Sequence, residues 1–144
     1  FRSVGWILAV VLAYVTYRLG RKESNIAKDR LIKEVSLWLE RCSSLIRTTQ
    51  TGYTDPISSK WLIQRHEEID ALLGMYAYAL KFDFVRSIRA TTRMIVYNIE
   101  YAAEFEQEEA SVFIDHIEYA LRMVQETYPR EYLKYYLEMD MLRS

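Results

Sequence analysis

The stretch GWILAVVLAYVTYRLGRK, residues 5–22, decides the class of fold. From Ser3 to Tyr17 the chain has 15 residues without a charge, and a helix of that length spans about 22 Å. The apolar core of a bilayer is about 30 Å thick, so the segment is short for a membrane span. The long side chains of Arg2 and Arg18 can reach the headgroups at either end and make up part of the difference.

Three interpretations of this segment are open. A cleaved signal peptide would end in small residues, whereas this segment ends in the bulky, basic stretch YVTYRLGRK. A helix buried in a soluble protein would show a polar stripe, and residues 4–15 have none. Trp6 near one end, with Tyr14 and Tyr17 near the other, is typical of membrane interfaces. The pattern therefore favours an uncleaved signal-anchor.

The charges that flank the segment predict its orientation. Only Arg2 precedes it in this sequence, whereas basic residues are frequent between Arg18 and Lys33. Positive charge is retained on the cytoplasmic side of a membrane. We therefore expect a single-pass protein of the cell membrane with its C-terminal bulk in the cytoplasm, where the lone thiol of Cys42 stays reduced.

The composition favours an all-α protein. The 144 residues include only 4 glycines and 2 prolines, too few for the many turns of a β-sandwich or barrel. The formal net charge is −1, and no basic cluster of the kind that binds nucleic acid is present. These features predict a membrane helix over residues 1–20 and a cytosolic helical bundle over residues 21–144.

Apolar residues repeat at helical spacing through most of the second part. A first line consists of Leu31, Val35, Trp38, Cys42 and Leu45, with Ile32, Leu39 and Ile46 beside it. We expect this helix to continue directly from the membrane segment.

Four further helices are expected. The first runs from Pro56 to about Leu80, and the second begins after Asp83, which would cap it. The third includes residues 112–124, and the last runs from about Pro129 to Leu142. Their predicted apolar faces comprise Leu62, His66, Ile69, Leu73, Tyr76 and Leu80; Val85, Ile88, Thr92, Ile95, Ile99 and Ala102; and Val112, Ile117, Leu121 and Val124. Short connections favour antiparallel neighbours, and hence an up-down bundle of four or five helices.

Residues that could support catalysis or metal binding do not form a known pattern. The two histidines, His66 and His116, lack the glutamate three residues earlier that a bundle metal site uses. A looser site with Glu100 and Glu104 is conceivable, but we expect no metal and no cofactor. Cys42 lies on an apolar face, and no glycine-rich elbow or phosphate loop is present. We therefore expect a protein that is not an enzyme.

Three groups of residues are candidates for binding. Arg86, Arg89 and Arg93 share one helix face and could bind a small anion, or they could pair with Glu67, Glu68 and Asp70. The late tyrosines Tyr128, Tyr132, Tyr135 and Tyr136 could dock a partner or pack within the bundle. Gly5, Ala9 and Ala13 form a small-residue face that would let another membrane helix approach.

The function expected from these features is that of an accessory or assembly subunit. It would lie in the lipid bilayer and bind another membrane subunit or its own copies, without contacting nucleic acid. The alternative is a helical sensor or effector that binds a small anionic ligand at the three arginines.

Overall fold

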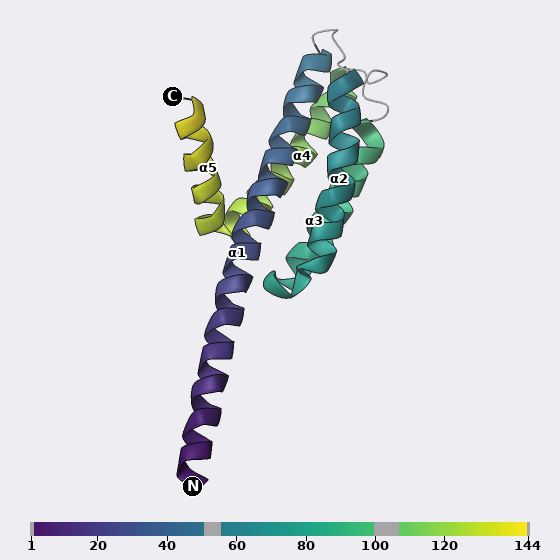
Figure 1. Cartoon of the computed structure of the whole chain (residues 1–144). Helices are drawn as coiled ribbons and strands as arrows, with labels where there is room; N and C mark the ends of the chain where they lie inside the picture. The colour runs from purple at the N-terminus through teal and green to yellow at the C-terminus, as the bar shows by residue number, and fades with distance from the viewer. Residues whose placement is uncertain (1, 51–55, 100–106, 144) are drawn as a thin grey trace.

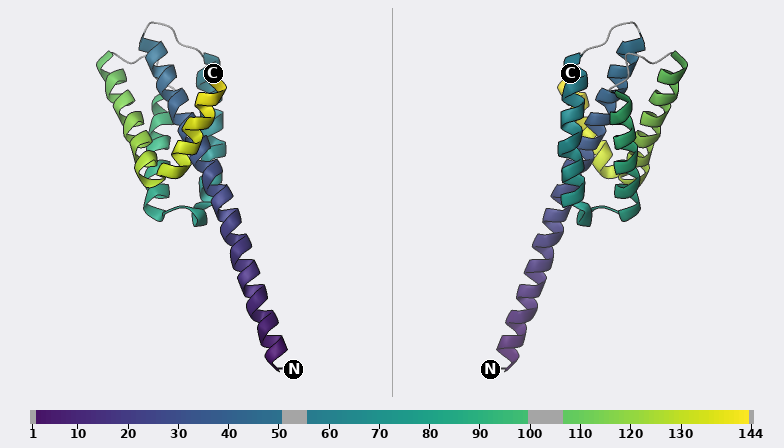
Figure 2. Two further views of the ribbon diagram at one scale, coloured as in Figure 1. Left: turned by 90° about the vertical axis from the view of Figure 1, so that its left-hand side faces the viewer. Right: turned by 90° about the vertical axis from the view of Figure 1, so that its right-hand side faces the viewer.

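The computed structural model describes residues 2–50, 56–99 and 107–143, and in these ranges the chain is all-helical, without a strand. The elements are α1 (Arg2–Gln50), α2 (Pro56–Met75), a 3-10 turn η1 (Ala77–Ala79), α3 (Phe82–Ile99), α4 (Gln107–Thr127) and α5 (Pro129–Arg143). Successive α-helices run in opposite directions, as Figures 1 and 2 show. The all-α prediction and the up-down order are confirmed.

Helix α1 is the longest element and has two parts. Its 49 residues correspond to about 74 Å, more than twice the thickness of a bilayer core. Residues 4–23 are exposed along their whole length and extend beyond the bundle (Figure 1); we call them the projecting segment. The first fully buried side chain is that of Leu31. The interpretation of the apolar stretch as a helix buried in this chain is therefore wrong, whereas its continuity with the next helix is confirmed.

The second part of α1 forms one wall of the core. All eight apolar residues predicted for its inner face are buried, from Leu31 and Ile32 to Leu45 and Ile46. They occupy a face that is wide enough for α1 to contact α2, α4 and α5. Helix α3 lies mostly against α2 and α4, so the four helices α1 to α4 close a bundle.

The boundary between α2 and α3 differs from the prediction in two ways. Helix α2 ends at Met75 instead of Leu80, because the backbone of Tyr76 leaves the α-helical region (φ −106°, ψ 22°) and continues into η1. Gly74, a poor helix former, directly precedes this end. Helix α3 begins at Phe82, so Asp83 lies in its first turn and does not cap it. Its carboxylate still lies near the positive end of the helix dipole.

The apolar faces of the later helices are largely as predicted. In α2, Leu62, His66, Ile69 and Leu73 are buried, and in α3 the five predicted positions from Val85 to Ile99 are buried. In α4, Ile117 and Val124 are buried, but Val112 is exposed because Phe113, Ile114 and Ala110 take the inward positions. Asp55, Glu100, Ala102 and Glu104 lie outside the described residues.

Helix α5 packs on the outside of the bundle against α1 and α4. Lys134 contacts Asp29 and Lys33 contacts Glu138, each at 2.8 Å, and Lys28 lies 3.8 Å from Glu131. These pairs join α5 to one side of α1. The pairs of Lys134 and Lys33 are exposed, whereas Lys28 and Glu131 are partly buried. Exposed ion pairs add little stability, so the main effect of the first two is to fix how α5 lies on α1.

A polar group of side chains lies within the core between α1, α2 and α3. The indole Nε1–H of Trp38 donates a hydrogen bond of 2.9 Å to the carbonyl of Leu62. His66 lies 5.4 Å from the Trp38 ring, between centroids, and its Nε2 is 3.2 Å from the hydroxyl of Thr92. Thr92 in turn donates to the carbonyl of Arg89. The hydrogen bonds of Trp38, His66 and Thr92 fix the relative positions of the three helices. The hydroxyl of Ser36, which is buried in α1, has no hydrogen-bond partner among the described residues.

Candidate functional site

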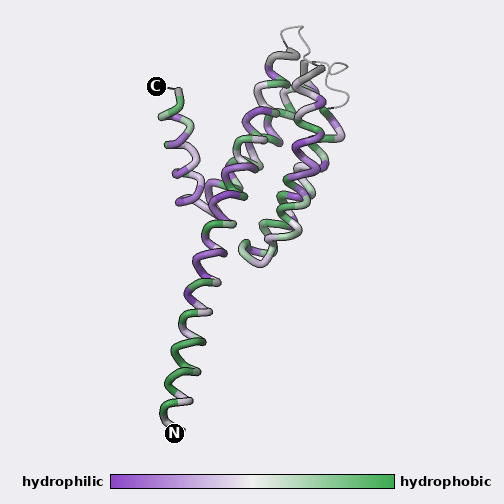
Figure 3. Tube along the Cα trace, viewed as in Figure 1, coloured by the Kyte–Doolittle hydropathy of each residue, from purple (hydrophilic) through white to green (hydrophobic). Residues whose placement is uncertain are grey.

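The projecting segment is the most unusual surface of the molecule. Within the helix Val4–Arg47, an 18-residue window has a mean hydropathy of 1.2, and none of that window is buried. Figure 3 shows the apolar residues gathered in the part of α1 that extends from the bundle. This helix is long and apolar enough to span a membrane. An isolated apolar helix of this kind would not stay exposed in water, because every turn would present hydrocarbon to the solvent.

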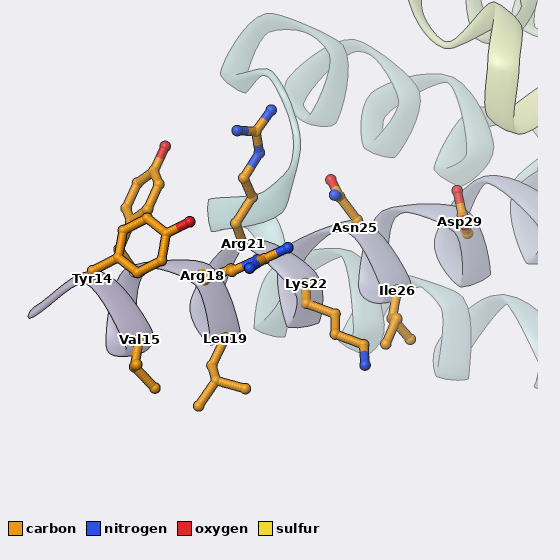
Figure 4. A pocket seen from close by; sticks show the side chains of 10 residues that line it. Tyr14, Val15, Arg18, Leu19, Arg21, Lys22, Asn25, Ile26 and Asp29 are labelled. Atoms are coloured by element: carbon orange, nitrogen blue, oxygen red, sulfur yellow. The ribbon is translucent and has the colours of Figure 1, made fainter. Parts of the chain in front are cut away.

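The end of the projecting segment nearest the bundle combines apolar, aromatic and basic side chains. Figure 4 shows Val15, Leu19, Lys22 and Ile26 on one side of α1, with Arg21 and Asn25 on another. Tyr14, Tyr17 and Arg18 belong to the same region and are exposed. Aromatic rings followed by basic side chains are typical of the level at which a helix leaves the apolar core of a bilayer.

The three small residues of the projecting segment share an open face. Gly5, Ala9 and Ala13 are exposed, and a Cβ atom added at Gly5 would meet no atom within 4 Å. A larger side chain at this position therefore has no steric effect within the chain itself. The structure thus shows that this face is open, and its contact with another membrane helix stays a prediction.

The arginine stripe on α3 is partly neutralised by one carboxylate. Arg89 donates to Asp70 through Nε at 2.9 Å and Nη2 at 3.2 Å, and Arg93 donates to the same carboxylate at 3.3 Å. These hydrogen bonds, chiefly the one from Arg89, lower the pKa of Asp70. Arg86 is exposed one turn earlier. Pairing with Asp70 was the second interpretation left open by the sequence, and it accounts for Arg89 and Arg93 without a ligand.

The other expected partners of the stripe have a different role. Glu68 pairs with Arg65 on α2 itself, and Arg65 also bonds Glu34 on α1. The bond to Glu34 is the main cause of the raised pKa of Arg65. Arg65 therefore joins α1 to α2.

Two of the four late tyrosines lie in the core. Tyr128 is buried, packs edge-to-face on Phe84 with 4.9 Å between ring centroids, and its hydroxyl accepts from the backbone N–H of Lys81 at 2.7 Å. Tyr135 is buried, and its hydroxyl donates to Glu40 at 2.5 Å. Packing within the chain, the alternative to docking, accounts for both.

The other two tyrosines lie farther out. Tyr132 is partly buried against the core, and Tyr136 is exposed on the outer side of α5. Leu133, Leu137 and Met141 are exposed on the same helix and follow one another every four residues, and Leu133 lies three residues before Tyr136. Of the four tyrosines, Tyr136 is therefore the best placed to meet a partner.

The histidines and the cysteine occupy unreactive surroundings. Burial is the main cause of the lowered pKa of His66, and burial also raises the pKa of the Cys42 thiol well above its usual value. His116 is exposed on α4. Among the described residues, no group of three or more His, Cys, Asp and Glu side chains lies close enough together to hold a metal ion.

Sequence reasoning missed one surface at the turn between α2 and α3. Met75, Tyr78 and Phe82 are strongly exposed there, although from the sequence this region was expected only to contain the end of one helix and the cap of the next. The detectable sign in the sequence was a large aromatic residue, Phe82, in a short connection outside any apolar face.

Comparisons with known protein families, with curated proteins and with solved structures give no match to this chain.

Proposed function

We propose that the protein is a single-pass membrane protein whose cytosolic bundle serves as an accessory or assembly subunit, without enzymatic activity. The observation that carries this proposal is the projecting segment, an apolar helix with none of its span window buried and with direct continuity into a packed bundle. Lipid is the solvent in which such a helix is stable, because its backbone is fully hydrogen-bonded within the helix and its side chains are apolar.

The orientation that we propose follows from the basic residues after the apolar stretch. Arg18, Arg21 and Lys22 are exposed immediately before the bundle. Such residues stay on the cytoplasmic side of a membrane, which supports a bundle in the cytoplasm. In this proposal the protein is a signal-anchor of the cell membrane.

The binding partner that we propose is another membrane helix, from a different subunit or a second copy of this chain. Its contact would be the small-residue face of Gly5, Ala9 and Ala13, which lies open in the structure. Small residues every four positions let two backbones pack closely in lipid, where close packing drives association. The exposed side of α5 around Tyr136 would extend the contact into the cytoplasm.

Replacing Gly5 and Ala9 with isoleucine tests the proposed contact. The change keeps the segment apolar and meets no atom of the chain at Gly5, so only the approach of a second helix is blocked. We expect the assembly that the double variant forms in mild detergent to be smaller than that of the unmodified chain, or to lack a co-purifying membrane protein. A matched control places isoleucine at Val4 and Val10, which lie on other sides of the helix. Unchanged assembly in the Gly5/Ala9 variant would exclude this face and leave the segment as a plain tether.

A further inference from the structure

Three large apolar side chains are exposed at the turn between α2 and α3, residues 75–82. Met75, Tyr78 and Phe82 expose 65%, 69% and 76% of their surface. The turn itself is fixed to the core: Leu80 is buried, and the ring of Tyr76, 6.1 Å from that of Tyr78 between centroids, packs against the core. The three exposed side chains are thus held outward by an ordered turn.

This turn lies at the end of the bundle from which the projecting segment emerges (Figures 1 and 2). A groove joins the two, lined on the α1 side by Glu23, Ile26 and Arg30 and on the other side by Leu72, Tyr76 and Tyr78. Ile26 is itself exposed. Exposed apolar side chains therefore continue from Leu19 on the projecting segment, past Ile26, to Tyr78.

The distance along α1 places the turn near the membrane surface. Ile26 follows Gly20, the end of the proposed anchor, by six residues, which is about 9 Å of helix. The headgroup region is about 6 Å thick on each side of a bilayer. Membrane helices tilt by about 20° on average. A tilt of α1 toward the side of the turn would bring the turn closer to the membrane surface. The rings of Tyr78 and Phe82 can therefore reach the headgroups.

The charges around the turn favour an anionic surface. Arg21 and Lys22 on α1, Lys81 in the turn and Arg130 at the start of α5 are exposed, against the exposed acidic residues Glu23, Asp83 and Glu126. Arg130 belongs to this end because the nearby Tyr128 hydroxyl bonds the backbone of Lys81. Basic side chains beside aromatic rings are the combination that binds an anionic leaflet.

We propose that the α2–α3 turn rests on the anionic surface of the same membrane, with Tyr78 and Phe82 inserted among the headgroups. This inference rests on the proposed membrane anchor and adds to it a second contact. Two contacts would fix the orientation of the bundle on the membrane and hold the outer side of α5 at a constant height above it.

Fluorescent probes on single introduced cysteines in the full chain test this contact. Cys42 is buried and its thiol has a raised pKa, so it can stay in place. The probe is attached at Tyr78→Cys, at Tyr14→Cys in the projecting segment, or at Lys60→Cys near the opposite end of α2. The chain is placed in nanodiscs of phosphatidylcholine with or without phosphatidylserine, with a quencher attached to the lipid headgroups.

We expect lipid quenching at position 78 to be at least threefold stronger than at position 60 when phosphatidylserine is present. Lys81→Glu should reduce the quenching at position 78 at least twofold, whereas Lys60→Glu, the same charge change at the far end, should leave it unchanged. If the probe at position 14 is quenched and the probe at position 78 behaves like that at position 60, the contact of the turn with the membrane is excluded. The proposed membrane anchor would then be unaffected. If position 78 is shielded from both lipid and aqueous quenchers, a protein covers the turn and the inference is overturned. Absence of quenching at Tyr14 would overturn the anchor itself.

Discussion

The hydroxyl of Tyr135 makes a hydrogen bond that joins α5 to α1, beside the three ion pairs between the same helices. Its ring is buried and its hydroxyl donates to Glu40 of α1. We expect Tyr135→Phe to lower the free energy of unfolding by about 1 to 2 kcal/mol, because a partly buried hydrogen bond to a carboxylate is lost. Denaturant titration in mild detergent measures the change. Tyr136→Phe, at the exposed next position, should cost less than about 0.5 kcal/mol. Equal effects of the two substitutions would contradict the assigned contact.

His66 makes the stability of the bundle depend on pH. Burial lowers its pKa in the folded chain, opposed by Asp70 and Glu67 and reinforced by Arg93. In the unfolded chain the pKa is near the ordinary value of 6.5. Just below pH 6.5 the unfolded chain therefore binds more protons at His66 than the folded chain does. The contribution of His66 to the free energy of unfolding is complete above that pH and is lost as the pH falls.

The expected result is a lower melting temperature at pH 5.5 than at pH 7.5, with a smaller difference in His66→Gln. Glutamine can still donate to the Thr92 hydroxyl, so the core hydrogen bond is kept while the titrating group is removed. Circular dichroism at both pH values measures the two differences. An identical pH dependence in both proteins would show that His66 is not the group responsible. Asp70 does not interfere, because its lowered pKa confines its effect to pH values below about 3.8.

At the scale of the element, α1 combines two helices of different character without a break. The sequence predicted its inner face fully, because burial on one side of a helix leaves a regular spacing of Leu31, Val35 and Trp38. The ends of α2 and α3 were less predictable. The end of α2 depends on the backbone of Tyr76, which no spacing of apolar residues records.

Residues at the proposed sites were predictable to different degrees. The projecting segment was evident, because a long charge-free run has few alternatives. The pairing of Arg89 with Asp70 required knowing how α2 and α3 face each other. The burial of Tyr128 and Tyr135, in contrast to the exposure of Tyr136, depends on how α5 lies on α1 and α4. The spacing of apolar residues within one helix does not determine contacts of this kind between helices.

The two parts of α1 should separate when the chain is shortened. Residues 4–23 are exposed, and full burial begins at Leu31. We expect a chain that lacks residues 1–18 to be soluble and helical, with a melting temperature within about 3 °C of the full chain in detergent. The reason is that residues 4–18, the part of the deleted stretch whose burial is described, are all exposed. Circular dichroism and gel filtration test this expectation. An unfolded or aggregated product would mean that the projecting segment belongs to the core.

At the scale of the whole molecule, the projecting segment leaves the helical bundle at one end. The aromatic turn of residues 75–82 and the basic residues Arg21, Lys22 and Lys81 lie at that same end. Apolar and basic surfaces are thus concentrated where a membrane would be. In the orientation that we propose, the outer side of α5, with the exposed Tyr136, would face away from the membrane and could meet a partner.

Membrane insertion with the bundle in the cytoplasm is the central claim, and labelling of introduced cysteines in intact cells tests it most directly. A membrane-impermeant maleimide is applied to cells that produce the Lys60→Cys variant, before and after permeabilisation, and the membranes are then washed with alkaline carbonate. We expect the protein to stay in the washed membranes and to be labelled at position 60 only after permeabilisation. Release by carbonate would contradict the membrane span, and labelling in intact cells would contradict the orientation.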